Sequence, residues 1–438
     1  MKFRIFTIFF LFTYIVFSQT EVYFLKDTES NLNLKAVQNK HFKLLKDQIL
    51  EPHSNATYWF KIPAYQTDSD YIFRVVYERI NDAEVFQNSK KIQKLLKQRF
   101  LSYKFSRKFD VYVKVKPKLH AYVPIEFKLE KEAIANEKNH LLLNSFYYGF
   151  AFLVIINNLF YFFLFKDRSF LYYSLFLTSM SFGVFTMDGM LNYFPIYEDV
   201  NNLLMILNYI FLAFFSSKFA NNYLFLDTYF PKLKKFSYAI GIVIIVFGVF
   251  YLVFQNYYYL LFLNILVFFL LFIYWFSAVL LFNKNIYTKI LVFAYTIILF
   301  SGIDFFILKF LGISLVNINP TNIKIGAFLE MIILSIAVLY RMNTLKEENE
   351  YMRREIINYA KQLSELVIPK QEENKNNLDE LSQRERQIFS LITSGKSNKG
   401  IGVELNISVI TVKFHVKNIY EKLNIKSRKE ALTLEVSL

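Results

Sequence analysis

Two lysines and a phenylalanine near the end of the chain share one face of a short predicted helix. Lys413, Phe414 and Lys417 are adjacent or three and four positions apart, a spacing that groups side chains on one side. Lysines neutralise phosphates, and an aromatic ring can pack on a thymine methyl group. The opposite face carries apolar residues that would pack inward: Val412, Val416 and Ile419. These residues predict a helix whose exposed face meets a nucleic acid.

Four short helices are predicted to hold this face in place. A capping box opens the first, because Ser382 can accept from the backbone N–H of Glu385 and Glu385 can reach back to that of Ser382. Gly395 then ends this helix, as a left-handed C′ residue would. The other expected helices are 398–405, 409–423 capped by Ser408, and a fourth capped by Ser427 with Glu430. The segment 379–438 is therefore expected to form a compact all-α domain.

This segment resembles the LuxR-type (GerE-like) helix-turn-helix family over nearly all of 379–433. The resemblance runs through Leu381, Arg384-Glu385, 395–399, Ile401, Leu405, Ile407-Ser408, 411–413, His415, Ile419, Lys422-Leu423 and Ser427-Arg428. In that family the third helix enters the major groove of DNA. The resemblance implies that base edges are contacted by Lys413, Phe414 and Lys417. It implies phosphate contacts by Thr411, His415, Ser427 and Arg428.

The sequence departs from the family pattern at three positions. Gly400 and Gly402 stand where the family usually has an acidic residue and an alanine. Each glycine weakens its helix by roughly 0.5–1 kcal/mol relative to alanine, although Gly402 permits close packing of helices. Phe414 is bulkier than the usual residue at its position. An alternative without DNA is a helical domain that only contacts other proteins.

The rest of the chain has the composition of a membrane protein. Hydrophobic residues make up 54% of it, with 51 Phe and 31 Tyr among 438 residues and a net charge of +15. Residues 1–18 place Lys2 and Arg4 before an apolar run that ends at Ser18, which predicts a signal peptide or, alternatively, an uncleaved anchor. The absence of cysteine excludes disulfides and thiolate metal sites.

Seven apolar spans predict a transmembrane bundle at 141–341. They lie at 141–165, 169–189, 202–222, 237–255, 257–282, 287–309 and 321–341. Lysines and arginines gather in alternate loops, whereas the loops 190–201 and 255–256 contain none. By the positive-inside rule the basic loops are cytoplasmic, so the N-terminal domain is expected outside the bacterial inner membrane and the C-terminus inside.

Residues 19–138 are expected to form an exported all-β sandwich. Short alternating runs predict strands at 58–62, 71–77 and 111–118, and in the last the valines share one face. The other face of this strand would carry Tyr112, Lys114 and Lys116. No glycine precedes Gly149, so turns must use other residues.

This domain order resembles the bacterial seven-transmembrane receptors with diverse intracellular signalling modules, whose exported domain is a jelly-roll-like ligand binder. Eleven Lys or Arg lie between Lys90 and Lys118 with the single acid Asp110, which fits either an anionic ligand or a solvated basic face. Trp59 fits either stacking on a carbohydrate or burial in the core.

A heptad pattern at 342–368 predicts a parallel coiled coil between the bundle and the C-terminal domain. The seam of this homodimer would consist of Leu345, Asn349, Met352, Ile356, Tyr359, Leu363 and Leu366, with Met342 at its start. Asn349 at a core position is the usual device that fixes dimer register. The alternative is one amphipathic helix on a neighbouring surface. The polar segment 369–378 is expected to be a linker, and a dimer would favour a palindromic DNA site.

Two acidic residues inside the spans are candidate switches, because a charge within a bilayer needs a partner or a proton. Glu330 is near the middle of the seventh span and Asp304 in the outer part of the sixth. Asn157 or Asn158 in the first span would serve as a partner for Glu330.

We find no pattern that predicts an enzyme. The chain has no Gly-rich phosphate loop, and its five His residues have no metal-ligand spacing, so no catalytic residue, cofactor or metal site is expected. The sequence predicts a one-component membrane sensor that regulates transcription directly. The alternatives are a transporter-like bundle or a relay receptor whose tail is a protein-interaction module.

Overall fold

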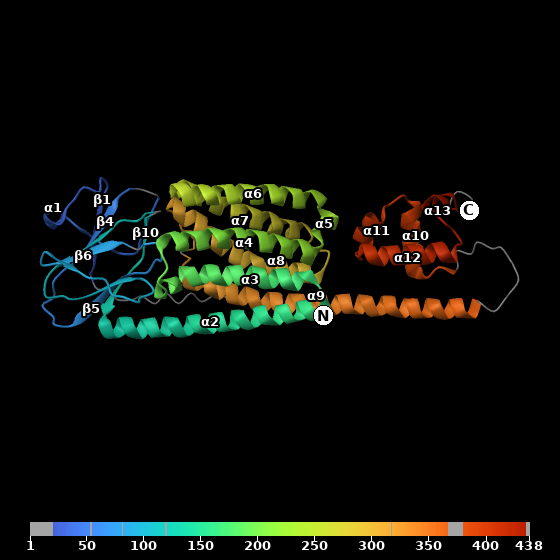
Figure 1. Cartoon of the computed structure of the whole chain (residues 1–438), viewed down its shortest axis with the longest axis horizontal. Coiled ribbons are helices and arrows are strands. Elements are labelled where there is room, and N and C mark those ends of the chain that lie inside the picture. The colour runs from blue at the N-terminus through green and yellow to red at the C-terminus, as the bar shows by residue number, and fades with distance from the viewer. Residues whose placement is uncertain are drawn as a thin grey trace. The chain divides into compact units, whose positions relative to one another are not determined.

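The chain folds as two compact units, and Figure 1 labels their main elements. The computed structural model describes residues 21–52, 55–80, 82–118, 121–316, 318–366 and 380–434. The expected signal peptide (1–18) and linker (369–378) lie outside these residues. The first unit contains the chain before Tyr147 together with Gly183–Asn202 and Asp304–Pro320. The second contains Tyr147–Phe182, Leu203–Ile303 and Thr321–Leu438.

Antiparallel strands form the β-domain, which comprises residues 21–129. The largest sheet has the order β2 (Lys43–Leu44), β1 (Tyr23–Asp27), β4 (Thr57–Ile62), β9 (Val111–Val115), β6 (Ala83–Gln87) and β7 (Lys90–Ile92). A second sheet contains β11 (Ile125–Leu129), β5 (Asp70–Val75) and β8 (Leu101–Ser106). A further pair joins β10 (Ala121–Val123) to β3 (Ile49–Glu51). The fold confirms the predicted β class.

The alternation of β9 explains its burial only in part. Val111, Val113 and Val115 are completely buried, as the spacing predicts. Tyr112, which was expected on the exposed face, is also buried, because Phe42 and the short helix α1 (Leu34–Gln38) cover that side of the sheet. The expectation of a half-exposed strand is therefore wrong at this position. A second apolar layer lies on the outside of the six-stranded sheet.

Turns in the β-domain form without glycine. The two-residue hairpin between β6 and β7 places Asn88 and Ser89 at φ of 49° and 61°. This left-handed region is costly for most side chains and is most often adopted by glycine or asparagine. The sequence therefore accepts backbone strain at this tip.

Among the residues that the structure describes, seven helices are long and apolar enough to cross a membrane, which agrees with the seven predicted spans. They involve α2 (Glu130–Phe165), α3 (Arg168–Met187), α4 (Glu198–Leu224), α6 (Pro231–Phe254), α7 (Tyr257–Leu280), α8 (Ile286–Ile303) with η2 (Asp304–Leu308) and η3 (Lys309–Leu311), and α9 (Pro320–Leu366). Two short elements are η1 (Met190–Tyr193) and α5 (Leu226–Tyr229). Helix α2 begins eleven residues before the predicted span at 141, so residues 130–138 are helical rather than part of the sheets. Helix α9 continues without a break past the span, as Figure 1 shows.

Four helices form the C-terminal domain, which comprises residues 380–434. They are α10 (Gln383–Thr393), α11 (Asn398–Leu405), α12 (Val409–Lys422) and α13 (Arg428–Leu434). Apolar residues from all four helices meet in one core, in which Ile388, Ile401, Val412, Ile419 and Ala431 are fully buried. The four predicted helices are confirmed.

Candidate nucleic-acid interface

Local sequence signals position helix α12. The capping box on α10 is complete: the Glu385 amide donates to Ser382 Oγ at 3.3 Å, and the Ser382 amide donates to Glu385 Oε2 at 2.9 Å. Ser408 caps α12 by accepting from the Thr411 amide at 3.0 Å. A third cap was not predicted from the sequence: Ser397 Oγ accepts from the Gly400 amide, three residues later, which is the usual position of the donor for a serine N-cap. These caps fix where each helix begins.

Glycines and an asparagine shape the turn between α11 and α12. A Cβ at Gly402 would lie 2.9 Å from the carbonyl oxygen of Ile407, so this glycine permits close approach of the two helices. At Gly400 the nearest side-chain atom would be 3.6 Å away, and the structure gives no packing reason for glycine there. Asn406 ends α11 in the left-handed conformation, with φ of 56°.

Helix α12 presents the predicted face to solvent. Val412 and Ile419 are fully buried, whereas Lys413 and Lys417 are exposed and Phe414 is half-buried. The two lysines border a concavity of about 490 Å³, which is also lined by Asn398, Val416, Tyr420, Glu421, Asn424, Ile425 and Lys426. Lys417 lies 3.8 Å from Glu421, a solvent-exposed pair that holds it weakly. A cationic, hollowed surface of this kind can accept a polyanion.

The four residues expected at phosphates fall into two pairs. Ser427 caps α13 by accepting from the Glu430 amide at 3.3 Å. The Arg428 guanidinium donates to Asn398 Oδ1 at 3.2 Å and to the carbonyl oxygen of Lys396, so it stays near the concavity. Thr411 and His415 lie on a different side of α12, and only 7% and 1% of their surfaces are exposed.

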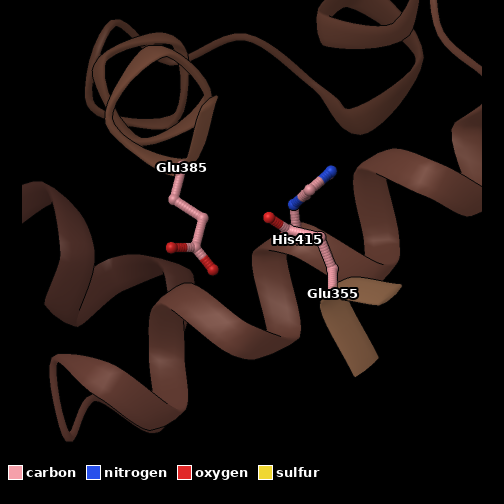
Figure 2. A group of neighbouring side chains, drawn as sticks. All are labelled: Glu355, Glu385 and His415. Atoms are coloured by element: carbon pink, nitrogen blue, oxygen red, sulfur yellow. The ribbon is translucent and has the colours of Figure 1, made fainter. Parts of the chain in front are cut away.

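His415 belongs to a polar group that the sequence did not reveal. One oxygen of Glu355 (α9), one of Glu385 (α10) and one ring nitrogen of His415 (α12) lie within 4.8 Å of one another, and Figure 2 shows the three side chains. Burial lowers the pKa of His415, which favours the neutral imidazole. Burial tends to raise the pKa of Glu385, but hydrogen bonds from Lys422 and the Ser382 amide outweigh it and lower this pKa.

A metal ion fits this group poorly. Lys422 Nζ already lies 2.6 Å from Glu385 Oε2, and the same carboxylate completes the capping box on Ser382. A metal cation would compete with Lys422 for the Glu385 carboxylate, and the Lys422 ammonium would repel it. The group is therefore a polar contact between α9 and the C-terminal domain, built from residues that are far apart in the sequence.

The predicted coiled-coil residues lie on a continuous helix in two environments. Asn349, Ile356 and Leu363 are exposed. Met352 and Tyr359 are half-buried against the C-terminal domain: Tyr359 Oη donates to the Asn418 carbonyl oxygen at 3.4 Å, and Met352 borders a cavity with Thr411. Leu345 and Leu366 also belong to α9.

The two acidic residues in the spans differ in their partners. Asp304 is 3% exposed and accepts from the backbone amides of Leu315 at 2.8 Å and Ile318 at 3.3 Å, so it organises the loop after η3. Glu330 is fully buried, and neither of its carboxylate oxygens has a hydrogen-bond partner among the described residues. The expected bond to Asn158 is not formed, because this amide donates to the Val154 carbonyl at 2.8 Å.

In the β-domain, Trp59 belongs to the core. It is 1% exposed and stacks on Phe86 with ring centroids 6.3 Å apart, which leaves no face for a sugar. Five of the eleven basic residues between Lys90 and Lys118 form ion pairs with carboxylates. These residues are Lys91, Arg99, Lys104, Lys108 and Lys118.

An ionic junction in the first unit was missed, because Arg99 looked like one member of a basic run. Its guanidinium bonds Glu137 of α2 at 2.5 Å and the carbonyl oxygen of Asp188 at 3.1 Å. Asn192 of η1 donates back to the Arg99 carbonyl at 2.5 Å. Arg74 adds a second ion pair to Glu137 at 3.1 Å. The β-domain is thus bonded to the start of α2 and to the loop after α3.

Comparison with known proteins assigns each region. Residues 379–434 match the family model "Bacterial regulatory proteins, luxR family", residues 140–341 match "7TM diverse intracellular signalling", and residues 19–128 match "7TMR-DISM extracellular 2". All three matches agree with the resemblances that the sequence gives. They are matches to regulators and receptors rather than to enzymes.

Curated relatives match a short part of the chain. The HTH-type transcriptional regulator MalT of Vibrio campbellii is 48% identical over 58 residues, which are 13% of this chain and 6% of the relative. MalT of Vibrio cholerae is 38% identical over 94 residues (20% and 10%), and MalT of Yersinia pestis is 46% identical over 52 residues (12% and 6%). The chain thus spans a tenth or less of the length of these relatives. Along the chain, a region similar to the extracellular domain of the 7TM receptors with diverse intracellular signalling is followed by one similar to their seven-helix domain, and then by one similar to the luxR family of bacterial regulatory proteins.

Proposed function

We propose that this protein is a one-component regulator, which senses an extracytoplasmic ligand and controls transcription by binding DNA itself. The observation that carries this proposal is the exposed pair Lys413 and Lys417 beside a concavity, on the third helix of a luxR-family domain. Base edges would be contacted by Lys413, Phe414 and Lys417. Phosphates would be contacted by Thr411, His415, Ser427 and Arg428.

The distribution of charge supports a position in the bacterial inner membrane. Lys166 and Lys284 lie in the loops before α3 and α8, and Lys232, Lys234 and Lys235 lie at the start of α6, whereas residues 190–201 contain no lysine or arginine. The positive-inside rule places the basic loops in the cytoplasm together with residues 379–438. Residues 1–18 would direct residues 19–138 across the membrane, residues 141–341 would span it, and 369–378 would link α9 to the DNA-binding domain.

We also propose that two copies pair through α9 in a parallel coiled coil over 342–368. Ile356 and Leu363 are 49% and 50% exposed, so they leave an apolar stripe on which a second copy could pack. The full seam would include Leu345, Asn349, Met352, Ile356, Tyr359, Leu363 and Leu366. A pair of helix-turn-helix domains would read a palindrome with half-sites about one DNA turn apart.

An anionic ligand is favoured over a neutral carbohydrate in the β-domain, because Trp59 is buried. A cavity of about 360 Å³ in the first unit is lined by Lys94 and Lys97, and by apolar residues that include Phe100 and Leu191. The lining also contains the amides of Gln98, Asn192 and Asn201, and Glu198, which is paired with Lys118. Two lysines beside apolar and amide side chains suit a ligand with one acidic group, hydrogen-bonding groups and a hydrophobic part. This cavity is the proposed ligand site.

Glu330 is the better of the two switch candidates. Asp304 accepts two backbone hydrogen bonds, which is a structural task, whereas the carboxyl of Glu330 is buried without such a partner. If the helix bundle has two arrangements, a buried acid of this kind can be protonated or hydrated in one of them and not in the other, and so favour one arrangement over the other. If Glu330 is the switch, Glu330→Gln should fix the transcriptional output in one state, and an unchanged response to stimulus would contradict this role.

Selection of DNA sites tests the proposed function directly. The full chain in lipid nanodiscs would be incubated with random-sequence DNA, and bound sequences would be amplified and sequenced through several rounds. We expect enrichment of a palindrome, and loss of that enrichment in the Lys413→Ala, Lys417→Ala double variant. The matched control removes two exposed lysines from α9 instead, Lys346 and Lys361.

The other possible functions predict a different result. A transporter-like bundle or a relay receptor with a protein-binding tail would enrich no sequence. Any residual DNA binding would be equal in the double variant and in the α9 control, because net charge alone would govern it.

A further inference from the structure

One side of α9 is paired with one side of α12. On α9 this side consists of Met352, Glu355 and Tyr359, which we call the α9 stripe. The side of α12 that faces it, which we call the α12 stripe, consists of Thr411, His415, Asn418 and Lys422. Both follow the three-and-four spacing that groups residues on one helix face. Earlier residues of α9 contact earlier residues of α12, so the two helices run in the same direction.

The contacts between the stripes are specific in position. Met352 and Thr411 line a cavity of about 270 Å³. Glu355 lies beside His415, and the ammonium of Lys422 lies 5.3 Å from the ring centroid of Tyr359. Tyr359 Oη donates to the Asn418 carbonyl oxygen at 3.4 Å. Contacts therefore extend over about two turns of α9 and about three turns of α12.

A second contact holds the domain in the same place. Asn406, at the end of α11, donates to Asn285 Oδ1 at 2.8 Å and to the Lys284 carbonyl at 3.3 Å, and it accepts from Tyr229 Oη at 3.2 Å. These partners belong to α5 and to the turn before α8. Asn406 is bonded at the loop between α11 and α12, so it restrains the helix-turn-helix itself.

This arrangement covers part of the expected DNA-binding surface. Thr411 and His415, two of the proposed phosphate contacts, are 7% and 1% exposed. The base-facing residues Lys413 and Lys417 remain exposed on the neighbouring side of α12. A DNA backbone that follows the major groove past α12 would meet α9 where its phosphates should lie.

Two of the α9 residues that cover α12 also belong to the seam of the proposed coiled coil. Met352 and Tyr359 occupy one of the two seam positions of the proposed coiled coil. Ile356 and Leu363 occupy the other seam position and stay exposed. A second α9 cannot pack on Met352 and Tyr359 while the C-terminal domain of the same chain lies there, because both partners require the same surface.

We propose that the α9 stripe is an interaction surface with two mutually exclusive occupants, the helix-turn-helix domain of its own chain and α9 of a second copy. The first occupant keeps the domain from DNA. The second forms the coiled coil and releases both domains together. This inference rests on the proposed function, because it assigns the control of the same DNA-binding domain.

A reversible cross-link tests the docked state in the full chain. The protein contains no cysteine, so Tyr351→Cys with Arg384→Cys introduces the sole pair of thiols. Both positions border the cavity between the stripes, but neither belongs to the seam or to the proposed DNA contacts. A bis-maleimide with a cleavable disulfide would join them in nanodiscs. We expect intramolecular cross-linking and at least about tenfold weaker binding to the selected palindrome, restored by reductant.

A matched control uses the same reagent inside the C-terminal domain. Lys396→Cys with Glu404→Cys replaces an exposed ion pair that does not touch α9. Cross-linking there should leave DNA affinity unchanged. If the Tyr351–Arg384 pair does not cross-link within one chain, or if the locked protein binds the palindrome as well as the reduced protein, the inference is wrong. If the cross-link forms but the reduced protein binds no DNA even at protein concentrations at which two copies pair, the proposed function is wrong while docking stands.

Discussion

Two junctions of this protein differ in how firmly they are bonded. In the first unit, Arg99 joins the β-domain to α2 through Glu137, with 5% and 13% of the two side chains exposed. In the second unit, α9 meets the C-terminal domain through Tyr359, whose hydrogen bond is 3.4 Å long and whose cation–π contact spans 5.3 Å. Breaking a buried ion pair costs about 3–5 kcal/mol, whereas a partly exposed cation–π contact is worth about 0.5–1 kcal/mol.

The difference teaches which junction can open. A junction with buried, doubly bonded charges moves as one body, so a displacement of the β-domain must carry the start of α2 with it. A junction with a few weak contacts can be separated by a small change in α9. We infer that the protein is stiff where the β-domain meets α2 and releasable where α9 meets the C-terminal domain.

Removing the Arg99 side chain should weaken the junction between the β-domain and α2 more than any other change considered below. Arg99→Ala leaves Glu137 with Arg74 alone and frees the carbonyl oxygen of Asp188, so local opening of β8 should become easier by about 3–5 kcal/mol. Hydrogen exchange of the β8 amides in the full chain measures this change. Lys91→Ala, which removes an exposed pair with Glu84, should leave exchange unaltered. Equal exchange in the two variants would contradict a firm junction.

A change in the loop after α3 should weaken the same junction by less. Gly189 has φ of 68°, and a Cβ there would lie 2.2 Å from the Arg99 carbonyl oxygen. Gly189→Ala should therefore cost at least the roughly 1–2 kcal/mol of a left-handed residue and push the loop from Arg99. Gly241→Ala is the control, because nothing lies within 4 Å of its added carbon. Thermal unfolding of the two full-length variants would show whether only Gly189→Ala lowers the midpoint.

Weakening the junction between α9 and the C-terminal domain should raise DNA affinity slightly. Tyr359→Ala removes the contact with Lys422, worth about 0.5–1 kcal/mol, so release should become about two- to fivefold more favourable. DNA affinity of the monomer should rise by the same factor in a binding titration. Ile356→Ala, on the exposed side of α9, should leave the yield of the Tyr351–Arg384 cross-link unchanged. A fall in affinity for Tyr359→Ala at monomer concentrations would contradict the weak junction.

Acidification should weaken the same junction gradually. Burial lowers the pKa of His415 in the docked state, while Glu355 and Glu385 oppose this change and Arg384 and Lys422 add to it. The released state therefore takes up a proton more readily, so docking is complete above the ordinary histidine pKa of about 6.5 and is lost as the pH falls below it. The yield of the Tyr351–Arg384 cross-link relative to that of the Lys396–Glu404 cross-link should decline between pH 7.5 and pH 5.5, because the reference pair corrects for the loss of thiolate. His415→Gln should make this ratio independent of pH.

Local signals in the sequence account for the C-terminal domain and much less for the junctions. Ser382, Gly395 and Ser408 determine where helices begin and end through neighbours within a few residues, so their roles could be predicted. The spacing of Val412 and Ile419 likewise predicts which side of α12 is buried. Capping and periodicity are short-range effects, and one sequence is enough to show them.

The contacts that distinguish the two junctions join residues far apart in the chain. Glu137 is 38 positions from Arg99, and Asn418 is 59 from Tyr359. No periodicity links such pairs, so Arg99 was counted in a basic run and Tyr359 was assigned only to a dimer seam. His415 was expected at a phosphate, and its burial beneath α9 depends on tertiary packing alone. Sequence therefore predicted the surfaces, and the structure shows which of them meet.

The central claim is that the exposed face of α12 binds DNA, and the salt dependence of this binding tests it most directly. The affinity of the full chain in nanodiscs for its selected palindrome would be measured across a series of salt concentrations. Lys413→Ala with Lys417→Ala should weaken binding to the palindrome and lower the preference for it over a scrambled duplex, because these lysines would contact base edges, while the control that lacks Lys346 and Lys361 keeps both. Arg428→Ala, at a proposed phosphate contact, should reduce the slope of log affinity against log salt by about one. Equal affinity and equal preference in the two double variants would contradict the claim.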